Sequence, residues 1–408
     1  MARELGGKRA AQIVAAIAVA ISPVSLTASA LFQYVSFDYL WWVLIAYMMI
    51  RLLKSEDPRW WLGVGAAIGL GMMTKYTMVF LVAGLAGGVL LTSARRYLKS
   101  PWLWCGAALS LLLFLPNLLW QVQHDFISLD FLRNIHARDI RIGRTDHFLI
   151  EQLLMPNPFT IPLWVAGLVY FFVVRDGKRY RALGWMFAIP FVLFLVSKGR
   201  GYYTAPAYPM LVAAGAVLTG RWAASLSTVR ARFVWGLTGA ALALGGVIAV
   251  VSVLPIAPLN SRWWSLVNKG NDNFREQVGW PELVRTVAGI HASLPAEERA
   301  HAGILAGNYG EAGAIDLYGP ALGLPRAISG INSYWLRGYG DPPPETLVVV
   351  GISRAFLERN FESCQLAGHV TNPYGIMNEE TTDHPDIYVC RKLRTPWAEF
   401  WKRFRYYG

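Results

Sequence analysis

Long apolar runs separated by short polar connections fill the first 250 or so residues of the chain. Runs of this kind are typical of membrane-crossing helices, although several are shorter than the roughly 20 residues that a straight crossing needs. The pattern predicts a polytopic α-helical membrane protein of about nine spans, at residues 10–26, 39–50, 60–73, 78–91, 102–120, 159–174, 182–196, 205–218 and 233–253.

The remainder is polar enough to fold as its own domain of about 150 residues, which is a typical domain size. We therefore divide the chain into a transmembrane domain at 1–258 and an α/β domain at 259–408. Short apolar stretches bounded by turn residues predict buried strands, and capped amphipathic stretches predict helices. The strands are expected at 303–305, 346–350 and 387–390, and the helices at 282–290 and 354–361.

Basic residues in alternate connections give the orientation. The connections 1–9, 51–59, 92–100, 175–181 and 219–232 hold 16 Lys and Arg, whereas those between them hold seven. The positive-inside rule then places the N-terminus in the cytoplasm, and nine crossings leave the α/β domain outside. Ala28-Ser29-Ala30 resembles a signal-peptide cleavage site, but the further spans favour an uncleaved first helix in a bacterial-type inner membrane.

The composition supports this class. With 54% hydrophobic and 16% charged residues and a mean hydropathy of +0.35, the chain is too apolar for an ordinary soluble protein. The net charge of +12 is gathered in the connections, which indicates membrane topology and not a nucleic-acid partner.

Asp38 and Lys75 are the first candidate site residues. No acid or base lies at 10–37, so Asp38 is the first charge after an apolar crossing, and Lys75 follows a later apolar run. A helical hairpin returns both to one membrane face, and ionisable residues at membrane depth are functional candidates. The alternatives are that Asp38 caps a helix beginning at Tyr39 and that Lys75 extends to the interface.

The connection at 121–157 is the longest in the transmembrane domain. Its charged residues include His124, Asp125, Arg133 and Arg138, which we take as candidates for an acceptor-binding or surface loop. Its apolar residues are spaced for an amphipathic helix on the membrane surface. A solvated loop beside lipid head groups is the alternative.

Three features of the second domain leave alternatives open. Residues 307–313 fit a plain strand-to-helix turn better than a phosphate loop, because the glycine spacing matches no nucleotide motif. The aromatic helix near 397–404 suits either the bilayer surface or packing against its own domain. Cys364 and Cys390 pair only if the domain is extracytoplasmic. The histidines and cysteines show no zinc-type spacing.

Several motifs in order resemble the C-type integral-membrane glycosyltransferases of the protein-mannosyltransferase and aminoarabinose-transferase type. They are SFDYL at 36–40, GLGMMTKY at 69–76, PNLLW at 116–120, HDF at 124–126, KGRGYY at 198–203, APAYP at 205–209, NYGEA at 308–312 and NSYW at 332–335. The resemblance implies inverting transfer of a hexose or pentose from a polyprenyl-phosphate donor to an envelope lipid, glycan or protein outside the membrane.

Such chemistry needs a carboxylate to take the acceptor's proton and cations to stabilise the departing phosphate. The resemblance gives these roles to Asp38 as the acid, and to Lys75, Lys198, Arg200, Tyr202 and Tyr203 around the donor phosphate. The cofactor is unknown, and the resemblance leaves a divalent metal open. Interface anchoring is the alternative for the bases and tyrosines.

One departure from the family concerns its principal catalytic acid, which lies in a first outer loop after an N-terminal span. Residues 1–9 resemble the cytoplasmic turn that follows this loop, so the loop itself is expected to be missing from this sequence. The rival hypotheses are a non-catalytic glycan-binding membrane subunit and a lipid-carrier transporter. Transporters often contain internal repeats, and we find no convincing repeat here.

Overall fold

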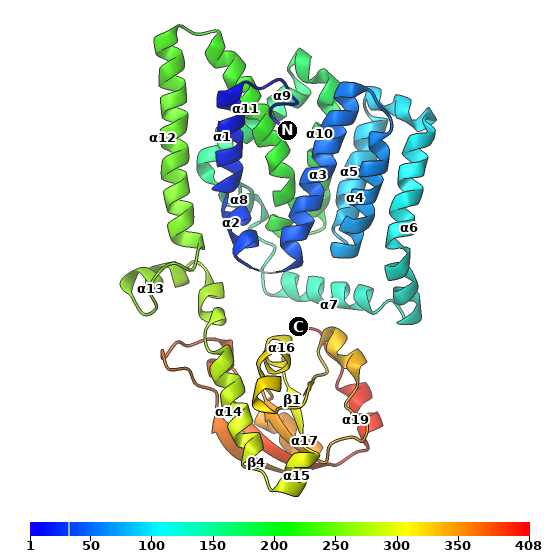
Figure 1. Cartoon of the computed structure of the whole chain (residues 1–408), viewed down its shortest axis with the longest axis vertical. Coiled ribbons are helices and arrows are strands. Elements are labelled where there is room, and N and C mark those ends of the chain that lie inside the picture. The colour runs from blue at the N-terminus through cyan, green and yellow to red at the C-terminus, as the bar shows by residue number, and fades with distance from the viewer. Residues whose placement is uncertain (32) are drawn as a thin grey trace. The chain divides into compact units, whose positions relative to one another are not determined.

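The chain divides into two units, Met1–Ile256 and Ala257–Gly408, in a computed structural model that describes residues 1–31 and 33–408. The first unit is a helical bundle and the second is built around one sheet (Figure 1).

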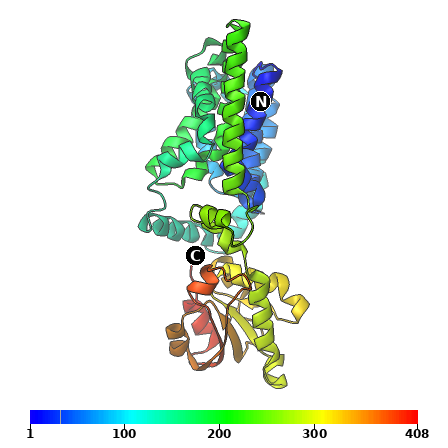
Figure 2. The ribbon, with the colours of Figure 1, turned by 90° about the vertical axis from the view of Figure 1, so that its left-hand side faces the viewer.

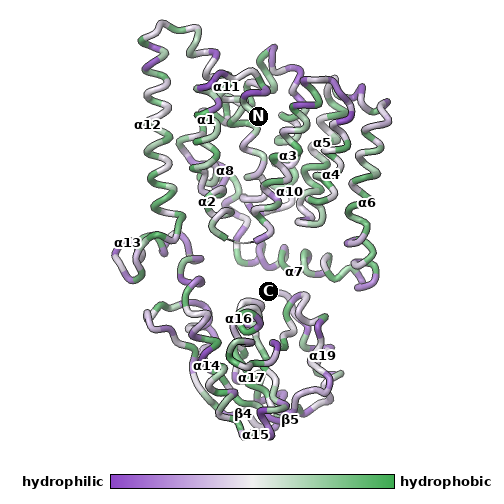
Figure 3. The backbone as a smooth tube through the Cα atoms, viewed as in Figure 1, coloured by the Kyte–Doolittle hydropathy of each residue, from purple (hydrophilic) through white to green (hydrophobic). Residues whose placement is uncertain are grey.

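All the long elements of the first unit are helices. The α-helices are α1 (Arg9–Ala20), α2 (Pro23–Ala30), α3 (Tyr34–Ser55), α4 (Trp60–Thr74), α5 (Met78–Leu90), α6 (Pro101–Gln123), α7 (Ile127–Arg141), α8 (Phe148–Leu154), α9 (Ile161–Phe172), α10 (Arg181–Val196), α11 (Tyr208–Ala224) and α12 (Thr228–Val253). The 3₁₀ helices are η1 (Ser93–Lys99), η2 (Pro158–Thr160), η3 (Arg175–Tyr180) and η4 (Gly201–Ala207). Hydrophobic residues follow the helices and polar residues gather in their connections (Figure 3).

Each of the nine apolar runs coincides with a helix or a bent helix pair, so a mostly helical multi-pass membrane protein is confirmed. Four of the described helices are long and apolar enough to cross a membrane, or up to seven if each bent pair is one span. The predicted count of nine is therefore not confirmed, because α4 is short and α1 and α2 meet at 58°. Figure 2 shows the long helix α12 running beside the others.

Glycines let the central helices approach closely. A Cβ added at Gly167 of α9 would lie 2.0 Å from the Leu211 carbonyl oxygen, and one added at Gly215 of α11 would lie 1.7 Å from the Leu163 carbonyl oxygen. Without a hydrophobic driving force between helices in lipid, such close backbone approach is a main source of packing energy. These contacts fix α9 and α11 against each other in the middle of the bundle.

Helix α7 differs from the bundle helices in direction. It runs across one end of the first unit (Figure 1). Phe126, Leu129 and Leu132 are 40–46% exposed along it, as expected of an amphipathic helix whose apolar side faces lipid. The predicted helix in the 121–157 connection is confirmed, and its place on a membrane surface stays a prediction.

The second unit contains a five-stranded sheet in the order β2-β1-β3-β5-β4. β1 is parallel to β2 and β3, whereas β5 is antiparallel to β3 and β4. The strands are β1 (Gly303–Ala306), β2 (Ala327–Ile328), β3 (Thr346–Val350), β4 (Phe361–His369) and β5 (Asp386–Leu393). The helices are α13 (Arg262–Asn268), α14 (Trp280–Ala292), α15 (Ala296–Ala300), α16 (Tyr309–Tyr318), α17 (Arg354–Asn360), α18 (Glu379–Thr382) and α19 (Trp397–Arg403), with the 3₁₀ helices η5 (Asp272–Gln277), η6 (Pro320–Leu322) and η7 (Asn332–Arg337).

Alternate residues of the central strands supply two cores, one on each face of the sheet. Ile304 and Val348 pack with α14 and α16, whereas Leu305 and Val349 pack with the aromatic residues of α19. Because both faces of the sheet are covered, these strands are continuous apolar runs in the sequence. Phe400 and Trp401 of α19 are buried in this core, so the aromatic helix packs on its own domain and does not lie on the bilayer surface.

The strands and helices predicted from the sequence are present, but β2 and β4 were missed. β2 is only two residues long, and β4 is an edge strand whose side chains are largely exposed. Neither carries the apolar pattern by which strands are recognised.

Cys364 of β4 and Cys390 of β5 form a disulfide, with their Cα atoms 4.1 Å apart. Their pairing in register across the two antiparallel strands brings the Cβ atoms together. The bond joins residues separated by 26 positions and ties the edge strand to the core.

We expect replacing both cysteines by alanine to lower the free energy of unfolding of this unit by about 3 kcal/mol, because a closed loop of this length restricts the unfolded chain. Hydrogen exchange of the β3 and β5 amides in the full chain, with and without reductant, measures the change. Replacing Cys105, which is free and exposed, is the control. Equal protection of the strands in all variants would contradict the prediction.

Candidate functional site

Asp38 lies inside helix α3, not at its start. The helix begins at Tyr34 with Gln33 at the N-cap, so Asp38 is not the cap of a helix beginning at Tyr39. It shares the buried stripe of α3 with Trp42 and Ile45, and it is 2% exposed. An acid on a buried helix face is costly unless it is paired, so its surroundings must supply a partner.

Lys75 supplies that partner. It ends α4, and its Nζ lies 3.6 Å from Asp38 Oδ2. The Lys75 side chain is 10% exposed and does not extend to solvent. The predicted hairpin of α3 and α4 therefore does return the acid and the base to one place.

Three tyrosine rings surround the lysine. Lys75 Nζ lies 4.3 Å from the ring centroid of Tyr203, 4.8 Å from that of Tyr202 and 5.6 Å from that of Tyr34. Aromatic faces attract a cation, and more strongly where water is excluded. We call Asp38, Lys75, Tyr34, Tyr202 and Tyr203 the cage.

The cage holds two buried polar atoms that make no hydrogen bond within the described part of the chain, although Lys75 Nζ keeps its ion pair with Asp38 Oδ2. Asp38 Oδ1 and Lys75 Nζ are buried without a hydrogen-bond partner among the described residues. Buried polar atoms are nearly always hydrogen-bonded, so such exceptions call for an explanation. A bound ligand that offers a proton donor to Asp38 and oxygens to Lys75 would satisfy both.

Tyr76, the residue after Lys75, holds the C-terminal end of α4 in place. Tyr76 Oη donates to Asn117 Oδ1 at 2.8 Å and accepts from Gln121 Nε2 at 2.8 Å, and Gln121 also donates to Ser128 Oγ. These bonds join the α4 end to α6 and α7. The motif residue Asn117 and Gln121 thus hold Tyr76, the residue that follows Lys75.

Arg200 is held by an acid that the sequence analysis did not single out. Arg200 Nε and Nη2 donate to the Asp139 carboxylate at 2.5 and 2.9 Å, and Asp139 is 3% exposed. Arg138 Nη2 lies 3.7 Å from the same carboxylate. The bidentate geometry fixes the guanidinium strongly, and it ties α7 to the segment that carries Tyr202 and Tyr203. Asp139 lies on a helix with several other charged residues, so the sequence did not indicate that this one is buried.

The segment η4 is also fixed from α8. Gln152 Nε2 donates to the Gly201 carbonyl at 3.0 Å, while Tyr208 Oη donates to Gln152 Oε1 at 3.1 Å and Thr204 Oγ1 donates to the same oxygen. Gln152 is 4% exposed, and its role gave no signal in the sequence. Two of the three tyrosines of the cage, Tyr202 and Tyr203, therefore lie on a turn that these bonds hold in place.

The remaining candidates lie apart from the cage. His124 ends α6, with Nδ1 2.8 Å from the Trp120 carbonyl oxygen, and Arg133 pairs with Asp130 on the surface of α7. Asp125 is exposed in the turn before α7, and Lys198 is exposed after α10. Within residues 1–31 and 33–408, no hydrogen bond or ion pair joins these four to Asp38 or Lys75.

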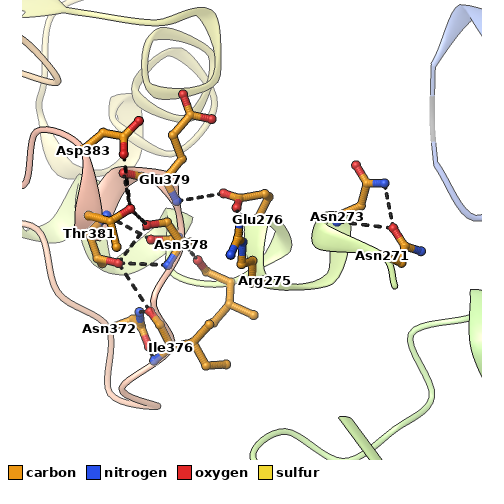
Figure 4. A network of polar contacts seen from close by, with 12 residues as sticks. Asn271, Asn273, Arg275, Glu276, Asn372, Ile376, Asn378, Glu379, Thr381 and Asp383 are labelled. Atoms are coloured by element: carbon orange, nitrogen blue, oxygen red, sulfur yellow. Dashed lines mark hydrogen bonds and ion pairs between the residues drawn. The ribbon is translucent and has the colours of Figure 1, made fainter. Parts of the chain in front are cut away.

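In the second unit, a polar network surrounds α18. Asn378 caps α18 through Thr381, and Glu276 accepts the Glu379 backbone N–H at 3.0 Å (Figure 4). Asn372 accepts the backbone N–H groups of Tyr374 and Ile376. The bonds shown stabilise turns.

Glu311 completes the strand-to-helix turn after β1. Its Oε2 accepts the N–H groups of Gly307 and Asn308, and Asn308 Oδ1 accepts the Glu311 N–H in return. This capping box confirms the turn expected at 307–313. Burial raises the pKa of Glu311 to about 7, with the nearby Glu380 adding to the shift, and burial also raises the pKa of Glu380 to about 7.

These shifts predict that the second unit loses stability as the pH rises. The folded state keeps a proton on Glu311 that an unfolded carboxyl, with its ordinary value of 4.5, releases. Its contribution, about 3 kcal/mol by linkage, is fully present below pH 4.5 and is lost as the pH rises through about 7.

Hydrogen exchange of β1 and α16 in the full chain between pH 5 and pH 8, corrected for intrinsic rates, measures this loss. Glu311→Gln keeps an acceptor for the capping box and is expected to make the profile less steep, with the share of Glu380 remaining. Glu282→Gln is the control, because the Arg285 hydrogen bond lowers the pKa of Glu282 and keeps it ionised. A profile as steep in Glu311→Gln as in the unchanged chain would reject the assignment.

A metal site is not evident in the part of the chain that the structure describes. No group of three or more His, Cys, Asp or Glu side chains there is arranged to hold a metal ion.

Comparison with known proteins gives two similarities. Residues 1–120 match the family model of dolichyl-phosphate-mannose-protein mannosyltransferases, a stretch that includes Asp38, Lys75 and Asn117. The chain is also 29% identical over 176 residues to the lipid A galacturonosyltransferase RgtD of Rhizobium johnstonii, covering 40% of this chain and 36% of that protein. No solved structure matches the chain at a significant level.

The matched stretch thus spans about a third of the length of the curated relative. Both similarities concern glycosyltransferases, and the motifs at 36–40, 69–76 and 116–120 lie within the family match. They confirm that the chain resembles the C-type integral-membrane glycosyltransferases of the protein-mannosyltransferase type.

Proposed function

We propose that the protein is a membrane glycosyltransferase that moves a hexose or pentose from a polyprenyl-phosphate donor to an envelope lipid, glycan or protein. The observation that carries the proposal is the cage, in which Asp38 Oδ1 and Lys75 Nζ are buried without hydrogen-bond partners among the described residues. The carboxylate and the ammonium group are the two that inverting sugar transfer requires.

In the proposed reaction the acceptor hydroxyl attacks the anomeric carbon as the bond to the donor phosphate breaks. Asp38 Oδ1 takes the hydroxyl proton, and the lipid phosphate leaves with the electron pair of the broken bond. Lys75 and Arg200 stabilise its negative charge, and Tyr202 and Tyr203 donate hydrogen bonds from their hydroxyls. The Asp139 carboxylate holds Arg200 in place for this role.

Lys198 and the α7 region are given supporting roles. Lys198 is assigned to the approach of the donor phosphate, since it lies two residues before Arg200 in the same turn. We assign the acceptor to the surface formed by His124, Asp125, Arg133 and Arg138. Of these, Arg138 is closest to the site through its contact with Asp139.

We also propose that the protein lies in the bacterial inner membrane, with a cytoplasmic N-terminus and an extracytoplasmic second unit. The excess of basic residues in alternate connections supports this orientation. The Cys364–Cys390 disulfide supports the extracytoplasmic side, because such bonds persist in oxidising compartments.

The test is transfer of labelled sugar in membrane vesicles. Vesicles that carry the full chain receive a polyprenyl-phosphate donor with a radiolabelled sugar, and label is followed into lipid, glycan and protein fractions. We expect label in one of these fractions, with release of polyprenyl phosphate. Donor moved across the membrane without loss of its sugar would indicate a transporter, and glycan binding without donor breakdown would indicate a binding subunit.

A further inference from the structure

The edge strand β4 of the second unit is long and open to solvent. It runs over nine residues, of which only Phe361 is buried, whereas Glu362, Ser363, Gln365 and Leu366 are exposed. No further strand pairs with β4 among the residues that the structure describes. Such an edge presents unpaired backbone groups, and proteins usually shorten, cover or charge it.

The opposite edge of the sheet is protected in two of these ways. β2 is only two residues long, and the segment around Tyr406 covers its continuation. Tyr406 N–H donates to the Gly330 carbonyl at 3.2 Å, and Asn332 N–H donates to the Tyr406 carbonyl at 3.0 Å. β4, in contrast, carries no proline or lysine, and Glu362 is its only carboxylate. The open edge of the sheet is therefore β4.

The register with β5 shows which backbone groups of β4 point outward. Cys364 and Cys390 lie directly opposite each other with their Cα atoms 4.1 Å apart, the close spacing of a non-hydrogen-bonded pair in an antiparallel ladder. The N–H and C=O of Cys364 therefore point away from β5, and alternation gives those of Glu362 and Leu366 the same direction. A bulge between Leu366 and Gly368 ends the regular stretch, so Cys364 is the centre of the open edge.

An antiparallel copy of the same stretch fits this edge. A two-fold axis at Cys364 places that residue opposite itself, Glu362 opposite Leu366 of the second copy, and Ser363 opposite Gln365 of the second copy. No like charges then lie directly opposite each other, which would be unfavourable across a strand pair. The arrangement continues the antiparallel order of β5 and β4, and it closes after two chains because each edge is used once.

Rigidity and membrane attachment favour a second copy over a free peptide. The disulfide of Cys364 and Cys390 holds the centre of β4 on its neighbouring strand, so little conformational entropy is lost when the edge pairs. A flexible peptide loses far more on becoming ordered. Two chains of a membrane protein are also inserted in the same orientation and held in one bilayer, which raises their effective concentration.

We propose that the protein forms dimers in which β4 pairs with β4 of a second copy, antiparallel and centred on Cys364, so that one sheet continues across both second units. The proposal goes beyond sugar transfer and does not rest on it, because it uses no residue of the cage.

The register makes opposite predictions for two substitutions at one position. Leu366 is 54% exposed, so its replacement is not expected to unfold the strand. Leu366→Glu places a carboxylate opposite Glu362 of the second copy, whereas Leu366→Lys places an amine there, and symmetry makes each contact twice. We expect Leu366→Glu to raise the dissociation constant of the dimer about tenfold and Leu366→Lys to lower it about threefold. Adding Glu362→Lys to Leu366→Glu is expected to restore the original value.

Energy transfer between chains measures the dimer. The full chain with Cys105→Ser and Glu297→Cys, an exposed position on α15, is labelled with a donor or an acceptor dye, and the two are mixed in lipid vesicles at falling protein density. We expect transfer that falls as the protein is diluted in lipid and that shifts with the Leu366 variants as stated. Leu317→Glu, at a leucine of α16 that is 71% exposed, is the matched control and is expected to change nothing.

Hydrogen exchange gives a second readout. The outward amides of Glu362, Cys364 and Leu366 are expected to be protected at high protein density and to lose protection on dilution in lipid. The amides of Ser363 and Gln365 point toward β5 and are expected to stay protected at every density, so they serve as the internal control.

Three results would count against the dimer. Absence of energy transfer at every density, or transfer that Leu366→Glu leaves unchanged, would overturn the pairing of β4. Equal weakening by Leu366→Glu and Leu366→Lys would overturn the register centred on Cys364. Protection of the outward amides by an added extended peptide, in chains that stay monomeric, would replace the second copy with a peptide partner.

Discussion

Replacing Asp38 by asparagine is expected to lower the rate of sugar transfer by about 100- to 10,000-fold, the usual contribution of a general base. Asparagine has nearly the same shape but cannot take the acceptor's proton at Oδ1. The turnover number is expected to fall, while the KM for the donor changes little, because the phosphate contacts come from other residues. Single-turnover transfer in vesicles, with insertion verified, measures the effect.

The matched control is Asp57→Asn. Asp57 is an exposed acid in the connection after α3, with a 45% exposed side chain, and it is not part of the cage. Its replacement is expected to leave transfer unchanged. If Asp38→Asn also retains full activity in a correctly inserted protein, the catalytic role of Asp38 is wrong.

Replacing Lys75 by methionine is expected to lower the free energy of unfolding of the first unit by about 3–5 kcal/mol, the usual effect of breaking a buried ion pair. The change leaves the buried Asp38 carboxylate without its cation. It is also expected to abolish transfer. Thermal unfolding in detergent, followed by light scattering and by proteolysis of the first unit, measures the stability.

The double variant separates the two roles of the pair. Asp38→Asn with Lys75→Met removes both charges, so most of the stability is expected to return. Transfer is not expected to return, because the acid and the cation are both absent. Recovered activity in the double variant would mean that the pair serves only the fold.

Much of the fold could be predicted because the bilayer restricts the choices. A chain in lipid must satisfy its backbone internally, so each apolar run between 10 and 253 had to be helical. In the second unit, β3 was predictable from its continuous apolar run, whereas β4 was not, because its exposed edge position needs no apolar pattern. The number of membrane spans could not be predicted from the sequence, because the bends and the short helices depend on how the helices pack.

The candidate site, too, could be predicted from the sequence only in part. The sequence alone predicted that a helical hairpin returns Asp38 and Lys75 to one membrane face, and the structure shows them as an ion pair. The resemblance grouped Arg200, Tyr202 and Tyr203 with Lys75, but only the tertiary structure decided that the two tyrosine rings contact the lysine. These residues come from segments more than 100 positions away, and sequence spacing carries no information on such distances.

Burial was likewise decided by the fold. Asp139 lies on a helix of mixed charge and gave no signal, but packing against η4 encloses it and makes it the fixed partner of Arg200. The sequence therefore determined which residues are helical and where charge meets the membrane boundary. The tertiary structure decided which polar atoms are buried away from water, because burial depends on neighbouring residues from distant segments of the chain.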